Sequence, residues 1–150
     1  MRRIICLILS VFVLSGCHTY TLQDAKKNGD IIVGHLGPTN FEKIDSFITD
    51  FENQKASKLR ITSYSEEGDP ILSDLIYDGK QINYIFDDSR DKHGGIQKGK
   101  DKTSCNKIEK RSVTREGSIK GFEYILTGCK EIIGFHSGDK NEIFLMFKAQ

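Results

Sequence analysis

The residues best suited to chemistry lie in a polar segment near the middle of the chain. Four potential ligands for a hard cation, Asp87, Asp88, Asp91 and His93, occur within seven positions. Calcium ions take several carboxylate oxygens from one loop, so this spacing permits an ion site, although it matches no calcium-loop pattern. A solvated turn explains the same residues equally well. The sequence therefore predicts no resident metal, and an ion-binding sensor stays open as an alternative function.

Basic side chains follow in the same segment, at Lys98, Lys100 and Lys102. Residues 92–120 contain 9 basic and 3 acidic side chains, a balance that suits contact with anionic head groups or wall polymers. Lysines along a strand edge are the alternative, because they prevent edge-to-edge pairing. Residues 87–103 hold few apolar side chains, so we expect a long exposed loop, disordered in part, and treat it as a possible binding loop.

No spacing in the chain points to a reaction. The serine-hydrolase pattern G-x-S-x-G is absent, and no histidine has a nearby partner at catalytic spacing. A hydrolase site assembled from distant residues such as His35, Arg60 and Asp69 is the enzymatic alternative. Otherwise the sequence predicts no catalytic set and no cofactor.

Charge and motif content exclude two further classes. The 22 basic and 21 acidic side chains leave a net charge of +1, which argues against a nucleic-acid-binding protein. Gly94–Lys100 fits the first seven positions of a phosphate-binding P-loop, but Asp101 stands where a serine or threonine must reach magnesium. No strand-to-helix pattern surrounds this segment, so we exclude a nucleotide site.

The beginning of the chain has the pattern of an export leader. A basic start is followed by the apolar run Ile4–Leu14, which is shorter than the roughly 20 residues that a membrane-spanning helix needs. Leu14-Ser15-Gly16-Cys17 then resembles the bacterial lipobox. That resemblance implies a diacylglyceryl group on the thiol of Cys17 and cleavage just before it. We expect a signal peptide at 1–16 and a lipid anchor and tether at 17–21. The protein is then attached to the extracytoplasmic face of the cell membrane.

Export also permits a disulfide between the two cysteines of the mature chain, Cys105 and Cys129. Gly117 is midway between them, and a three-residue turn centred there places the two cysteines opposite each other in a hairpin. The same register pairs Arg111 with Glu123, a favourable cross-strand combination. The sequence predicts a disulfide here, and the absence of short C-x-x-C steps disfavours a zinc site.

Two helices are expected before a series of strands. Thr21 begins a short helix that stops at Asn28-Gly29, and apolar residues at steps of three and four predict an amphipathic helix over Phe41–Phe51, capped by Asn40. A short strand is expected at 30–35. Further strands are expected at 58–65, 71–77, 81–86, 106–114, 121–127 and 142–148. Asp78-Gly79 predicts a two-residue hairpin turn.

These elements define an α+β fold: an antiparallel β-meander sheet with one main amphipathic helix and a short N-terminal helix packed on it. A length of 150 residues fits one domain, so we expect a single α+β extracytoplasmic domain at 22–150.

Several short runs in the mature chain carry a family resemblance. They include Asn28-Gly29-Asp30, His35, Asn40, Leu59-Arg60-Ile61-Thr62 and Gly68-Asp69-Pro70-Ile71-Leu72. On these residues the chain, from Tyr20 to about Phe147, resembles an uncharacterised family of small Bacillus-type lipoproteins. The resemblance implies a lipid-anchored extracytoplasmic domain and supplies no catalytic residue.

The sequence therefore favours a membrane-anchored binding or interaction module. Its partners are expected to be the membrane, through Cys17, and an unidentified protein, peptide or envelope component.

Overall fold

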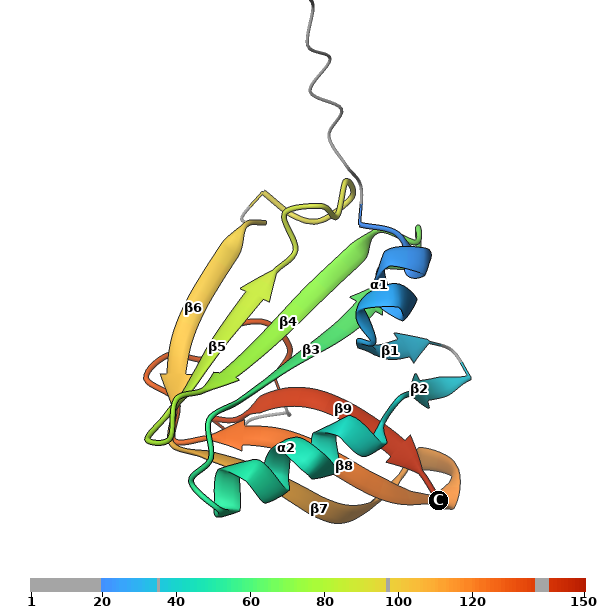
Figure 1. Ribbon diagram of the computed structural model, residues 1–150. Coiled ribbons are helices and arrows are strands. Elements are labelled where there is room, and N and C mark those ends of the chain that lie inside the picture. Colours follow the sequence, from blue (N-terminus) through green and yellow to red (C-terminus); the bar gives the residue numbers. More distant parts are fainter. Residues whose placement is uncertain (1–19, 35, 97, 137–140) are drawn as a thin grey trace, which may run out of the picture.

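The computed structural model describes residues 20–34, 36–96, 98–136 and 141–150. The predicted α+β class is confirmed, with two α-helices and mostly antiparallel strands in this part of the chain (Figure 1). The elements in chain order are α1 (Leu22–Asn28), β1 (Ile31–Gly34), β2 (Gly37–Thr39), α2 (Glu42–Glu52), β3 (Ser57–Tyr64), β4 (Pro70–Tyr77), β5 (Ile82–Asp87), β6 (Lys100–Cys105), β7 (Lys107–Arg115), the 3₁₀ turn η1 (Glu116–Ser118), β8 (Ile119–Thr127) and β9 (Ile143–Ala149). Neither described helix is long and apolar enough to cross a membrane.

The strands are divided between two sheets. One has the order β2-β1-β3-β4-β5-β6 and the other the order β7-β8-β9. Strands β3 to β6 pair antiparallel in sequence order, as a meander does, whereas β1 pairs parallel with β3, with Ile31 opposite Ile61. Asn106 alone separates β6 from β7, so the chain passes from the first sheet to the second at this residue.

Both predicted hairpin turns are present. In the β7–β8 hairpin the turn is centred on Gly117, whose φ of 72° favours glycine, and Arg111 lies opposite Glu123 as expected. The β4–β5 turn is one residue later than the predicted Asp78-Gly79: Asp78 donates its N–H to the carbonyl of Gln81, and Gly79, with a φ of 96°, and Lys80 form the turn. One oxygen of the Asp78 carboxylate accepts hydrogen bonds from the backbone N–H groups of Lys80 and Gln81, which fixes this turn.

The expected loop at 87–103 is shorter in the structure. Lys100 and Lys102 lie on β6, which pairs with β5 over its full length and places Lys102 opposite Ile85. Periodicity could not reveal this strand, because β6 is an edge strand with no apolar residue before its final cysteine. The connection that remains, 88–99, is closed by a backbone hydrogen bond from the N–H of Asp88 to the carbonyl of Gly99.

The cap of the first helix is as predicted, and that of the second is different. Thr21 and Asp24 form a capping box at the start of α1. Asn40 has a φ of 55° and does not cap α2; its side chain instead donates to the carbonyl of Asp30. Helix α2 begins after Phe41 with no side-chain cap.

One hydrophobic core joins the two sheets and α2. Its largest fully buried side chains include Phe47 of α2, Tyr84 of β5 and Tyr124 of β8. Ile44 and Phe47 lie on the apolar stripe of α2, and Phe51 of the same helix packs against Tyr77 of β4. Alternate residues of β3 to β5 point into this core. The residues between them, among which are Arg60 and Asp74, form the opposite face of the first sheet.

Candidate functional site

The structure joins Cys105 and Cys129 in a disulfide. Cys105 is the last residue of β6 and Cys129 follows β8, so the bond connects the two sheets rather than two strands of one hairpin. Cys17 and His35 lie outside the described residues.

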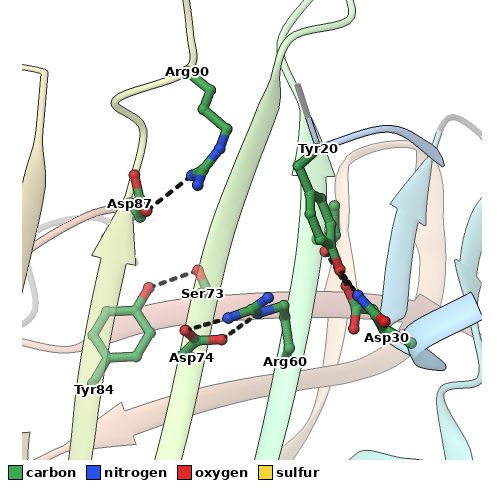
Figure 2. Close-up of polar contacts among 10 residues, drawn as sticks. Tyr20, Asp30, Arg60, Ser73, Asp74, Tyr84, Asp87 and Arg90 are labelled. Carbon is green, nitrogen blue, oxygen red and sulfur yellow. Dashed lines mark hydrogen bonds and ion pairs between the residues drawn. The ribbon is translucent and has the colours of Figure 1, made fainter. Parts of the chain in front are cut away.

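The carboxylates of the candidate loop hold its turns together. Asp87 accepts hydrogen bonds from the backbone N–H and hydroxyl of Ser89, and from Arg90 at 2.9 Å (Figure 2). Asp88 accepts the N–H of Gly99 at 2.6 Å. Despite the burial that opposes it, the bonds from Ser89 and Arg90 lower the pKa of Asp87.

Asp91 is engaged in the same way and does not converge with Asp87 and Asp88 on one point. One oxygen of its carboxylate accepts the N–H groups of His93 and Gly94, and its backbone carbonyl accepts a bond from the Lys98 side chain. Asp91 and His93 do approach Glu67 of the β3–β4 turn, with possible ligand atoms within 4.8 Å of one another. The structure thus places Asp91 and His93, two of the four predicted ligands, beside Glu67, which the sequence did not indicate.

A polar network fixes the N-terminal end of the described chain to the first sheet. The hydroxyl of Tyr20 donates to the carboxylate of Asp30 at 2.5 Å, and Thr62 of β3 donates to the same oxygen at 2.7 Å (Figure 2). Asn28 donates to the Tyr20 hydroxyl, and the guanidinium of Arg60 lies 5.7 Å from the centre of the Tyr20 ring. Asp30 is buried, so these bonds satisfy a carboxylate that water barely reaches.

Arg60 also forms a two-pronged ion pair with Asp74, at 2.5 and 2.8 Å, on the open face of the first sheet (Figure 2). The hydrogen bonds that Arg60 donates to Asp74 raise the pKa of Arg60 above its already high usual value. Beneath this face, burial raises the pKa of Tyr84 to about 12, while its hydroxyl is bonded to that of Ser73. These are structural pairs with every charge compensated.

An apolar hollow of about 730 Å³ lies next to the Tyr20 network. Three separate segments build it: the start of α1, the β1–β2 hairpin and the β3–β4 turn. Its wall includes Leu22, Ile32, Leu36, Tyr64 and Pro70. The volume is typical of a small-molecule site, and a mostly apolar wall with a few polar groups is the usual composition of such sites.

Tyr64 supplies an unusual polar group in this wall. Its hydroxyl oxygen is inaccessible to water and has no hydrogen-bond partner among the described residues. Burial first, and then the nearby Tyr20, Asp30 and Asp24, raise the pKa of Tyr64, so the group remains a protonated donor at neutral pH. An unpaired buried donor is costly to the folded protein, and because water does not reach this hydroxyl it does not open into the hollow.

A second, more polar hollow of about 380 Å³ includes Arg60 and Asp74 in its wall, whereas Asp69 belongs to the wall of the first. Asp69 also accepts the backbone N–H of Lys92 at 2.8 Å, which ties the 88–99 connection to the β3–β4 turn. The enzymatic alternative needs Arg60 and Asp69 in one hollow, and the structure places them in the walls of two.

The fold and this hollow define a small α+β domain with a preformed apolar concavity and no assigned chemistry. Residues 28–120 match the domain of unknown function DUF4362, and the chain belongs to that family. No curated protein and no solved structure matches the chain significantly.

Sequence reasoning missed the hollow because its wall comes from three segments that are unremarkable one by one. A signal did exist in the family-like runs. Gly68, Asp69 and Pro70 belong to these runs and line the hollow. Asn28, Asp30, Asn40, Arg60 and Thr62 also belong to them, and they form the network that holds Tyr20.

Proposed function

We propose that this protein is a lipid-anchored extracytoplasmic lipoprotein whose single domain is a binding module, with the apolar hollow as its ligand site. The observation on which the proposal rests is the hollow itself, a concavity of about 730 Å³ that the fold forms without a ligand. The lipobox-like run ending at Cys17 supports the anchoring part.

The hollow supports binding better than the 88–99 connection does. The carboxylates of Asp88 and Asp91 in that connection, and of Asp87 just before it, already accept hydrogen bonds from backbone N–H groups of the connection. The hollow instead leaves apolar wall atoms exposed to water. A ligand that covers these atoms gains hydrophobic free energy. The ligand we expect is the apolar part of an envelope component.

Gly34 allows a direct test. A Cβ placed on Gly34 meets nothing within 4 Å, and the residue lies in the wall of the hollow, so the side chain of Gly34→Trp starts in open space and we expect it to occupy the site. Gly95 offers the matched control: its Cβ is equally free, and it lies on the 88–99 connection outside the hollow. The probe is the apolar dye anilinonaphthalene sulfonate, titrated into the Cys17→Ser form, which lacks the anchor.

We expect saturable dye fluorescence with one site per chain, lost in Gly34→Trp and retained in Gly95→Trp. Equal thermal stability of the two variants excludes unfolding as the cause of the loss. Dye binding that survives in Gly34→Trp, or no saturable binding to the parent protein, would contradict the proposed function.

A further inference from the structure

The hollow lies at the end of the domain that the lipid anchor holds. Tyr20 is in its wall and is fixed to Asp30 and Asn28. Tyr20 is three positions after Cys17 in the sequence, and each step extends at most about 3.6 Å, so the span is at most roughly 11 Å. With Cys17 anchored, the hollow therefore lies against the membrane surface.

The rim of the hollow has the character of a membrane contact. Leu36 is fully exposed and Leu22 is 46% exposed, although most large apolar side chains of the described residues are buried. Lys26 is also in the wall, where its ammonium can pair with a lipid phosphate. Of the other exposed apolar residues, Ile96 lies on the 88–99 connection, which the Asp69–Lys92 bond ties to the same end of the molecule, whereas Ile119 begins β8 and Phe135 follows that strand.

We propose that the hollow binds an acyl chain of a bilayer lipid, drawn from the membrane in which Cys17 is anchored. This inference rests on the proposed function and names its ligand class. An acyl chain matches the apolar wall, and the phosphate of the same lipid can face Lys26 at the rim. The membrane supplies this ligand at a very high effective concentration because of the short tether.

The lipid of the bilayer is a better occupant than the acyl chains on Cys17 itself. Every methylene that the anchor withdraws from the membrane weakens the attachment. A bilayer lipid has no such cost, since its chain exchanges one apolar environment for another.

The chain contains no tryptophan, so a single introduced tryptophan reports on its own surroundings. Leu36→Trp places the reporter at the rim of the hollow. Ile119→Trp places a matched reporter at a half-exposed isoleucine of the second sheet. Both lipidated proteins are reconstituted into phosphatidylglycerol vesicles, with and without bromine atoms on the lipid acyl chains.

Bromine quenches tryptophan only at contact, so we expect strong quenching of Leu36→Trp and little quenching of Ile119→Trp. Adding Gly34→Phe to Leu36→Trp fills the hollow and should restore most of the fluorescence. Quenching that persists in the filled protein would show that the rim merely touches the bilayer, and would overturn the inference. Absent or equal quenching of the two reporters would also overturn it.

The dye titration separates this inference from the function on which it rests. If the Cys17→Ser form binds the dye at the hollow but lipid bromine does not quench Leu36→Trp, the binding module stands and the bilayer-lipid ligand is wrong. Exclusion of the dye from the unquenched lipidated protein would assign the hollow to the acyl chains of the anchor, and would equally reject a bilayer lipid.

Discussion

The hydroxyls of Tyr64 and Tyr124 differ in whether the folded protein itself uses them. The hydroxyl of Tyr64 is buried and has no partner among the described residues, whereas that of Tyr124 donates to Asp45 at 3.2 Å. Removing the group from each measures what an unpaired buried donor costs and what a paired one contributes.

Tyr64→Phe should leave the melting temperature unchanged or raise it, because it removes an unpaired buried donor that costs about 1–3 kcal/mol. The same change should leave laurate binding to the Cys17→Ser form unchanged, because the hydroxyl is buried away from the hollow. Calorimetric titration and thermal unfolding measure the two effects. Tyr124→Phe should lower the melting temperature, because it removes a hydrogen bond that the folded protein uses.

Arg111 determines part of the response to acid. Arg111 donates hydrogen bonds to Glu109 and Glu142. The bond that Glu109 accepts from Arg111, and after it the bond from Lys107, lower the pKa of Glu109. A carboxyl group with a lowered pKa contributes stability above its unfolded pKa, and the contribution is lost as the pH falls through the folded value.

Arg111→Met should therefore destabilise the protein at pH 7 and have a smaller effect at pH 3. Urea unfolding at the two pH values measures the difference, and Lys130→Met serves as an exposed control with no expected pH dependence. An effect of Arg111→Met that is the same at both pH values would contradict the assignment.

At the scale of elements, the disulfide connects the two sheets at the point where the chain crosses between them. Cys105 ends β6, and Cys129 follows β8 at a sequence separation of 24. A closed loop of this length stabilises a protein by roughly 3 kcal/mol in the chain-entropy estimate.

The Cys105→Ala/Cys129→Ala variant should melt roughly 6–12 °C below the parent protein, at about 2–4 °C per kcal/mol for a chain of this size. Scanning calorimetry with and without dithiothreitol checks this. Reductant should lower the melting temperature of the parent protein and leave that of the variant unchanged. A parent protein that does not respond would show that the two thiols are free.

The elements that sequence could predict are those with a local cause. The stripe of Phe47 and Ile44 predicted α2, and complementary residues around Gly117 predicted the β7–β8 register. The parallel pairing of β1 with β3 depends on a crossover through α2 and has no local signal. Strand β6 escaped detection because its polar residues gain order from pairing with β5 rather than from burial.

In the whole molecule, three features belong to the same end of the domain. These are the short sequence separation of Cys17 from Tyr20, the hollow, and the exposed Leu22 and Leu36 on its rim. None of the three was evident in the sequence as a site, since the wall of the hollow forms only when 20–26, 32–39 and 64–70 come together. The lipobox-like run alone could be seen in advance.

Lipid anchoring at Cys17 predicts where the protein is found in the cell. The parent protein should sediment with the membrane fraction and resist extraction by high salt, because two acyl chains hold it. Cys17→Ser should remove that attachment, whereas Cys6→Ser, in the expected signal peptide, should not. Cell fractionation followed by immunoblotting measures this. A Cys17→Ser protein that stays in the membrane fraction would contradict lipid anchoring at this residue.

Nuclear magnetic resonance of the Cys17→Ser form, titrated with laurate, shows directly whether the ligand binds in the hollow. We predict that backbone amide shifts change first at Leu22, Gly34 and Gly68, which surround the hollow, and that Lys98 and Lys102 stay unchanged. Shifts confined to residues 88–102, or no specific shifts at saturating laurate, would contradict the account.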